Sequence, residues 1–180
     1  MRGILAFVAA LGIAGHTCAA EAPAACSAPA PLPAEFAGWR EAAPLAAATT
    51  PAAARSAPLV LGTARKLTLA FGSTVTNAAP PERPDAGAGK AGMVSFTVAT
   101  PGTYRVALGA GAWVEVVRDG KAARSVAHGH GPECSGIRKI VDFQLAPGRY
   151  VLQLTASDMP EVTAMIVPGA APAAPHGSAH

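Results

Sequence analysis

The chain has 180 residues, of which 51% are hydrophobic, 5% aromatic and 14% charged, and its formal net charge is +3. Alanine accounts for 44 residues, so the hydrophobic fraction overstates the available core, because an alanine side chain buries little area. A typical soluble domain is about 25% charged, and this composition excludes a coiled coil. The basic residues are scattered without interleaved aromatic residues, so we expect no nucleic-acid partner.

The first 20 residues have the features of a secretory signal peptide. Arg2 supplies the positive charge, Ile4–Ile13 forms an apolar run, and Ala19 and Ala20 offer a small-residue cleavage site. The run is shorter than the roughly 20 apolar residues that span a bilayer. We therefore predict a periplasmic or secreted protein with no transmembrane span after cleavage. A retained N-terminal anchor is the alternative.

Export changes the interpretation of the three cysteines. Cys18 leaves with the signal peptide, so Cys26 and Cys134 remain in the mature chain. Two cysteines in an oxidising compartment predict a disulfide. The bond would close a loop of about 109 residues, which the chain-entropy model values at on the order of 4–5 kcal/mol. Two unpaired thiols are the alternative.

Composition divides the mature chain into three parts. Residues 21–58 are rich in Ala and Pro and predict a linker, within which Leu32–Ala48 is a short docking segment with Trp39 as its packing anchor. Residues 168–180 form a second Ala- and Pro-rich stretch, which we predict to be a disordered tail. The part between them, residues 59–167, is predicted to be the folded domain.

The central part has short apolar stretches that alternate with polar residues and are separated by Gly and Pro. This pattern predicts an all-β fold, a single antiparallel β-sandwich of jelly-roll type with about eight short strands. Asp119-Gly120 is a strong hairpin signal between two of the strands. The predicted strands are Lys66–Phe71, Met93–Ala99, Thr103–Leu108, Trp113–Arg118, Ala122–Ala127, Ile140–Leu145, Tyr150–Leu154 and Val162–Val167.

One local pattern occurs twice. Pro101-Gly102 and Pro147-Gly148 are each followed by a strand that begins near a tyrosine, Tyr104 in the first case and Tyr150 in the second. We expect each tyrosine to bury its ring and to form a hydrogen bond through its hydroxyl group.

These motifs resemble those of a known domain family. Gly102-Thr103-Tyr104, the stretch Trp113–Gly120 and Gly148-Arg149-Tyr150 are similar to the pattern of the bacterial pre-peptidase C-terminal domain, and the similarity covers about residues 93–167. The resemblance implies a jelly-roll-like β-sandwich of an exported protein. Some members bind calcium through acidic residues of the central strand, but here that strand has a single carboxylate, Glu115, so we expect no calcium site.

One cluster carries metal-ligand residue types. His128 and His130 are two residues apart, and Glu133 follows shortly after them. On a strand the two imidazoles share a face, and imidazole with carboxylate suits a divalent transition metal such as Zn²⁺, Cu²⁺ or Fe²⁺. The alternative is a Gly-rich loop with exposed histidines, in which Cys134 pairs with Cys26.

The same cluster resembles the first cupin motif, because Gly120, His128, His130, Glu133 and Gly136 stand in the order that the motif requires. The chain is also similar to short exported bacterial proteins that carry a homogentisate 1,2-dioxygenase label. These resemblances imply a small metal-dependent enzyme of dioxygenase type. The residues do not support that activity, because the second cupin motif needs a further histidine, and none follows His130 within the predicted domain.

No nucleophile elbow or phosphate-binding loop occurs in the sequence. We therefore expect a non-catalytic binding or envelope-associated module whose ligand is a small molecule, a glycan or an envelope protein. Two alternatives stay open. One is the cupin-like enzyme, and the other is a periplasmic metal-binding protein that uses the His128–His130 cluster together with His176 and His180 of the tail.

Overall fold

The structure is a computed structural model that describes residues 26–83 and 87–169. The predicted signal peptide, residues 1–20, lies outside the described residues, as does the predicted tail beyond Gly169. Within the described ranges, no helix is both long and apolar enough to cross a membrane.

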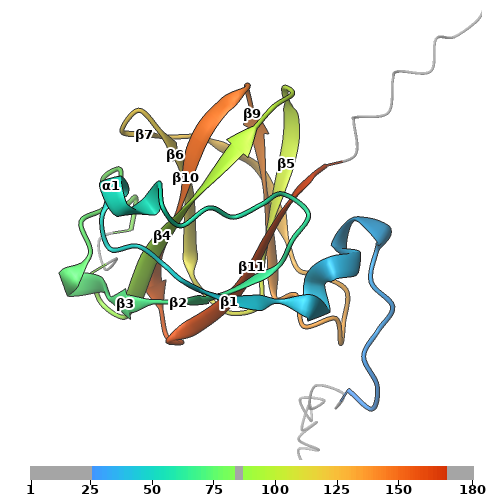
Figure 1. The fold of residues 1–180 in the computed structure, drawn as a ribbon. Helices are drawn as coiled ribbons and strands as arrows, with labels where there is room; N and C mark the ends of the chain where they lie inside the picture. The colour runs from blue at the N-terminus through green and yellow to red at the C-terminus, as the bar shows by residue number, and fades with distance from the viewer. Residues whose placement is uncertain (1–25, 84–86, 170–180) are drawn as a thin grey trace, which may run out of the picture.

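Two sheets pack face to face as a β-sandwich (Figure 1), which confirms the predicted all-β class. All strand pairs are antiparallel except β1 with β2. The six-stranded sheet has the order β1-β2-β11-β5-β9-β8, with bounds Ala43–Ala46, Arg65–Thr68, Glu161–Pro168, Gly102–Leu108, Lys139–Leu145 and Ser125–Gly129. The five-stranded sheet has the order β3-β4-β10-β6-β7, with bounds Ala70–Phe71, Lys90–Val98, Gly148–Ser157, Trp113–Arg118 and Lys121–Ala122. Three short helical elements complete the fold: η1 Ala34–Glu41, α1 Pro51–Ala54 and η2 Gly72–Thr74.

Each predicted strand range coincides with an observed strand or with two short ones. The predicted strand 66–71 is divided into β2 and β3, and the predicted strand 122–127 is divided into β7 and β8. Both divisions occur where the chain leaves one sheet and joins the other. Hydrophobic alternation continues through such a crossing, so the sequence pattern does not reveal it. The hairpin at Asp119-Gly120 is confirmed, since both residues have positive φ, 52° and 75°, as a type I′ turn requires.

The main core lies between the two sheets and is built by alternating residues. On β5, for example, Tyr104, Val106 and Leu108 are buried members of this core, whereas Thr103 and Arg105 are only partly buried. Because successive side chains on a strand point to opposite faces, one sheet face supplies the core and the other faces outward.

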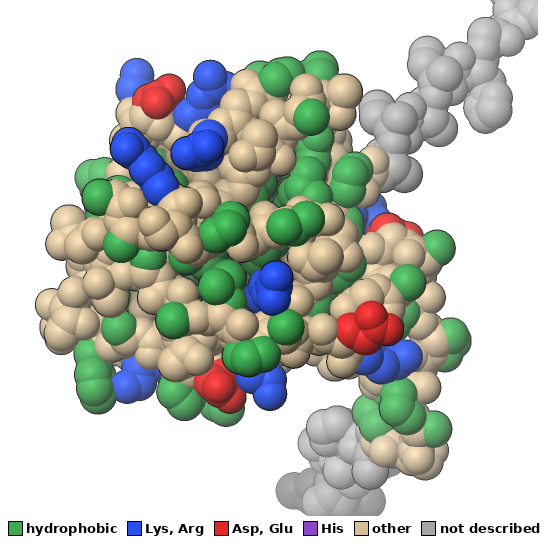
Figure 2. Space-filling model, in the orientation of Figure 1, with side chains coloured by type: hydrophobic (Ala, Val, Ile, Leu, Met, Phe, Trp, Pro, Cys, Tyr) green, Lys and Arg blue, Asp and Glu red, His purple; other side chains and the backbone are tan. Residues whose placement is uncertain are grey.

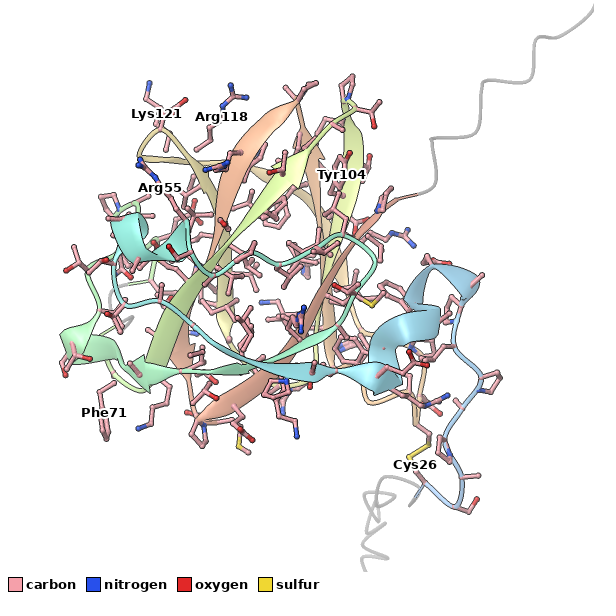
Figure 3. All side chains as sticks on the ribbon, viewed as in Figure 1. Cys26, Arg55, Phe71, Tyr104, Arg118 and Lys121 are labelled. Carbon is pink, nitrogen blue, oxygen red and sulfur yellow. A yellow bond between two sulfur atoms is a disulfide. The ribbon has the colours of Figure 1, made fainter. Side chains whose placement is uncertain are left out.

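Both repeated tyrosines occupy the predicted position. The Tyr104 hydroxyl (Figure 3) donates a hydrogen bond to the carbonyl of Thr100 at 2.8 Å, and the Tyr150 hydroxyl donates one to Ala146 at 2.9 Å. Both rings are buried, and the ring of Tyr150 stacks on Phe96 with 5.6 Å between centroids. The expectation of a buried ring with a bonded hydroxyl is therefore confirmed at both sites.

The outer face of the six-stranded sheet is covered by η1 in the predicted docking segment. Phe36 and Trp39 are 1% and 5% exposed and form a second apolar cluster with Ala107, Met165 and Val167. The packing role predicted for Trp39 is confirmed. This cluster explains why outward-facing residues of β5 and β11 are apolar.

Much of the segment expected to be a linker belongs to the folded unit. Ala48 and Met93 exchange two backbone hydrogen bonds of 2.8 and 2.9 Å, and the Leu59 N–H donates to Ser95 at 2.7 Å. These contacts cover the outer edge of β4, which would otherwise expose unpaired backbone groups. The fold thus begins before the predicted boundary at residue 59. Backbone pairing needs no large side chain, so an Ala-rich composition conceals it.

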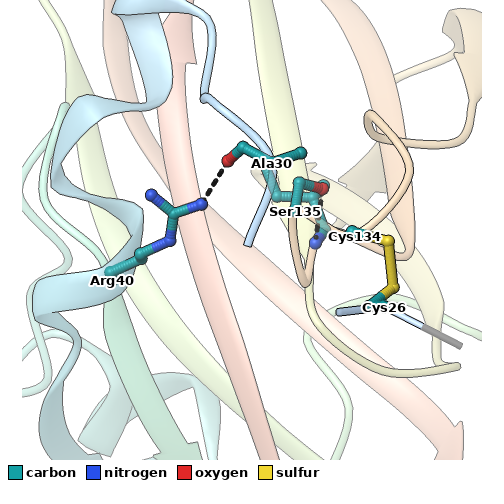
Figure 4. The surroundings of a disulfide bond; sticks show 6 residues. Cys26, Ala30, Arg40, Cys134 and Ser135 are labelled. Atoms are coloured by element: carbon teal, nitrogen blue, oxygen red, sulfur yellow. Dashed lines mark hydrogen bonds between the residues drawn. A yellow bond between two sulfur atoms is a disulfide. The ribbon is translucent and has the colours of Figure 1, made fainter. Parts of the chain in front are cut away.

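A disulfide between Cys26 and Cys134 is present, as predicted (Figure 4). Next to it, the Ala30 N–H donates to the carbonyl of Cys134 at 3.1 Å, and the Arg40 guanidinium donates to the carbonyl of Ala30. The bond therefore ties the start of the described chain to the loop before β9. Disulfides persist in oxidising compartments, which fits a location outside the cytosol.

We predict that the disulfide stabilises the native state mainly by restricting the unfolded chain. The linked residues are 108 positions apart, so replacing both with serine should lower the free energy of unfolding by about 2–4 kcal/mol. Denaturant unfolding of the oxidised protein and of the C26S/C134S variant measures this. The reduced wild-type protein is the control and should unfold like the variant. An unchanged midpoint in both would contradict the prediction.

Candidate ligand-binding cleft

A cleft of about 760 Å³ lies on the side of the sandwich where the sheets end at β6–β7 and at β8–β9. Its floor includes three residues of the main core, Val114 on β6 and Val141 and Phe143 on β9. The other lining residues are Glu82, Trp113, Glu115, Ala122, Ala123, Arg124, Ser125, His128 and Lys139. Apolar and polar groups thus meet in one concave site.

The cleft exists because the edge of the five-stranded sheet is incomplete. β7 has only two residues and pairs with β6 at Val117 and Arg118. The chain then crosses to the other sheet, where β8 begins at Ser125. Over Trp113–Val116, the only strand paired with β6 in the described chain is β10. The side wall of the sandwich is therefore open at this point.

Trp113 forms one end of the cleft together with two cations. The Lys139 Nζ lies 5.4 Å from the centre of the Trp113 ring, and the Arg83 Cζ lies 5.9 Å from it. Lys139 comes from β9 in one sheet and Trp113 from β6 in the other, so the lysine reaches across the open side. Its ammonium also donates to the carbonyl of Ala112 at 3.3 Å.

The surroundings of Lys139 disfavour the positive charge of its ammonium group. Partial burial, and secondarily the positive charge of Arg83, lowers the pKa of Lys139 below its usual value of 10.5. Lys139 forms no ion pair with any carboxylate of the described residues. An ammonium group in this position favours an anion that approaches from the cleft.

A buried polar cluster fixes the part of the lining that carries Glu82 and Glu115. Gln153 is fully buried on β10, and its Oε1 accepts from the N–H of Ala78 at 2.6 Å and of Ala79 at 3.3 Å. Its Nε2 donates to the carbonyl of Ala79 at 3.1 Å and to the carboxylate of Glu115. Glu115 also accepts from the Glu82 N–H at 2.8 Å. These bonds hold the loop 77–83 on the outer face of the five-stranded sheet.

Two of the three predicted metal ligands, His128 and His130, line one small hollow of about 270 Å³ together with Asp142. His128 also lines the cleft, and the His130 Nδ1 lies 2.9 Å from the carbonyl of Arg138. Glu133 is exposed on the following loop, and Cys134 is engaged in the disulfide. Across residues 26–83 and 87–169, no three His, Cys, Asp or Glu side chains lie close enough together to hold a metal ion.

Sequence reasoning did not identify the residues that shape the cleft, namely Trp113, Lys139 and Gln153. One signal was present in the sequence. Glu115 and Gln153 are single polar residues inside strongly apolar strands, and such residues are usually hydrogen-bonded to one another or to the backbone when buried. The contact between Lys139 and Trp113 has no comparable signal, because it joins two strands far apart in the chain.

A separate basic area lies on the face drawn in Figure 2. Lys and Arg side chains gather at its upper left, where Figure 3 places Arg55, Arg118 and Lys121. Arg118 is bound to the fold, since its guanidinium donates to the carbonyl of Pro147 at 3.0 Å and pairs with Asp119 at 3.5 Å. Lys121 is exposed and is a convenient reference for lysine substitutions in the cleft.

Comparison with known proteins adds no functional information. No protein-family model matches the chain, and no curated protein matches it significantly. The resemblances to the pre-peptidase C-terminal domain and to the cupins therefore stay predictions.

We predict that the hydrogen bonds of the Gln153 side chain stabilise the fold around the cleft. Gln153→Met should lower the free energy of unfolding by about 3 kcal/mol, because it leaves one oxygen of the Glu115 carboxylate and two loop N–H groups without a partner. Gln144→Met is the matched control, since Gln144 is exposed on β9 and bonds only to Thr103. It should change stability by less than about 0.5 kcal/mol. Equal losses in denaturant unfolding would contradict the prediction.

The lowered pKa of Lys139 predicts a pH dependence of stability. Between the folded-state pKa and 10.5, the unfolded chain carries a proton that the folded protein lacks. The free energy of unfolding should therefore rise with pH in this window and be reduced by the buried charge below it. We expect the wild-type protein to gain stability relative to Lys139→Met as the pH rises toward 10.5. Lys121→Met should show no such relative change, and an equal response of both variants would refute the assignment.

Proposed function

We propose that the protein is an exported, non-catalytic binding module that holds a small molecule in the cleft beside β6. The observation that carries this proposal is that core residues Val141 and Phe143 line an open cleft together with Trp113. Val141 and Phe143 are themselves buried, 5% and 1% exposed, and form the base of the cleft. The more exposed apolar part of the lining is Trp113, Ala122 and Ala123.

The size and lining of the cleft favour a small molecule over a glycan chain or an envelope protein. Small-molecule sites are concave, about 300–1,000 Å³ in volume, and mostly apolar with a few placed polar groups. The cleft has about 760 Å³, within this range, and its lining divides evenly between apolar residues such as Trp113 and polar ones such as Lys139 and His128. The fixed loop 77–83 makes one wall rigid before any ligand arrives.

Two further observations support the export component of the proposal. The Cys26–Cys134 disulfide is typical of an oxidising compartment, and the sequence begins with the features of a signal peptide. We therefore place the protein in the periplasm or outside the cell as part of this proposal.

NMR screening of the disulfide-bonded protein tests the proposal. The library contains neutral sugars, short peptides, organic anions and organic cations. We expect hits whose shift changes centre on Val141 and His128. Ser125→Trp should weaken those hits by about tenfold or more, because Ser125 lies opposite Phe143 on the cleft side of β8 and a tryptophan there fills the cleft.

Ala127→Trp is the matched control on the same strand. Ala127 is exposed and lies opposite Asp142, on the other face of the sheet, so this variant should bind as the wild type does. The proposal fails if no compound binds in the cleft, or if the two tryptophan variants affect the hits equally.

A further inference from the structure

The charges around the cleft indicate what kind of small molecule it accepts, an inference that rests on the proposed binding function. The cleft lining carries Lys139, Arg124 and His128 as cationic or potentially cationic groups, and Glu82 and Glu115 as carboxylates. The arrangement of these groups, and the partners they already have, decides which ligand charge is complementary.

The Lys139 ammonium group can donate more hydrogen bonds than it does. Of its three ammonium N–H groups, only one has an acceptor among the described residues, the carbonyl of Ala112. The nearby indole Nε1 of Trp113 is buried and has no hydrogen-bond partner. Because that nitrogen has almost no exposed surface, the donor that this end of the cleft offers to an incoming acceptor is the Lys139 ammonium group.

The carboxylates of the lining do not supply that acceptor. The two oxygens of Glu115 already accept hydrogen bonds, one from the Glu82 N–H and one from Gln153. Glu82 itself is exposed, so water screens its charge. Neither carboxylate forms an ion pair with Lys139. The charge at the Trp113 end of the lining that has no ion-pair partner among the described residues is therefore the positive charge of Lys139.

The floor next to this charge is apolar. Val114, Val141 and Phe143 line it but are only 8%, 5% and 1% exposed, so the apolar area open to water belongs mainly to Trp113, Ala122 and Ala123. Covering that area with a hydrocarbon body removes it from water, at roughly 25 cal/mol per Å². A small inorganic anion would pair with the ammonium group but would leave this area uncovered.

We propose that the cleft binds a small amphipathic anion, whose carboxylate or phosphate head lies at Lys139 and whose apolar body lies over Trp113, Ala122 and Ala123. The head forms a charge-assisted hydrogen bond with the ammonium group, and the body extends the main core into the open side of the sandwich.

A matched series of probes tests both parts of the ligand without any substitution. Octanoate has the head and the body, 1-octanol lacks the charge, and acetate lacks the body. On the wild-type protein we expect octanoate to bind about tenfold or more tightly than either of the others. NMR titration measures the affinities and places the shift changes at the cleft. If octyl phosphate binds as tightly as octanoate, the proposal is also supported, and the cleft then accepts either a carboxylate or a phosphate as the head group.

Substitutions then assign the head-group contact. Lys139→Met should reduce octanoate affinity to that of 1-octanol, while Lys139→Arg should retain most of it. Lys121→Met removes the same charge from an exposed site on β7 and should leave octanoate binding unchanged. Heteronuclear NMR spectra establish that each variant is folded, and the probe series on the wild type remains decisive if one is not.

Several results would overturn the proposal. Equal affinity of octanoate and 1-octanol for the wild type would remove the role of the charge, as would an unchanged octanoate affinity in Lys139→Met. If a neutral sugar binds in the cleft and neither octanoate nor octyl phosphate does, the proposal of an anionic ligand is wrong. The proposed binding function would still hold. A cleft that binds no compound of any class would overturn both.

Discussion

The side-chain amide of Gln153 is the contact on which the shape of the cleft depends. It lies fully buried between the loop 77–83 and the five-stranded sheet, and it bonds to backbone groups of that loop and to Glu115. The loop contains two consecutive prolines before Glu82, and proline cannot donate to a strand ladder. A buried side chain therefore replaces the missing backbone pairing and brings Arg83 to the ring of Trp113.

The small side chains of this protein place a second constraint on the fold. An Ala-rich segment contributes little apolar area, so residues 42–59 attach largely by backbone hydrogen bonds along strand edges, with Leu59 at the end of the segment buried in the main core. The aromatic anchors Phe36 and Trp39 lie in η1. The disulfide at Cys26 adds a covalent attachment next to this helix. Edge pairing, two aromatic anchors and one disulfide together hold a segment whose composition alone suggests disorder.

Local patterns predicted the sandwich well and the cleft poorly. Alternation identified the strands, Asp119-Gly120 identified its hairpin, and the two tyrosines were placed with their hydroxyl contacts. These features depend on residues close together in sequence. The cleft depends on Lys139 crossing to Trp113 and on Gln153 meeting the loop before β4. Such contacts follow from the order of strands in the two sheets, and periodicity carries no information about that order.

The lysine at position 139 accounts both for the openness of the cleft and for the positive charge in it. Lys139 precedes Val141 and Phe143 at the same alternating positions of β9, so the pattern would place an apolar side chain there. An apolar residue at this position would pack against Trp113 and extend the core toward the open edge. A lysine instead brings an ammonium group that must keep contact with polar atoms or water. The side of the sandwich next to β6 therefore stays accessible, and the group that keeps it open is also the one that attracts an anion. Departures from local sequence rules concentrate at functional sites, and this position is the clearest such departure in the described core.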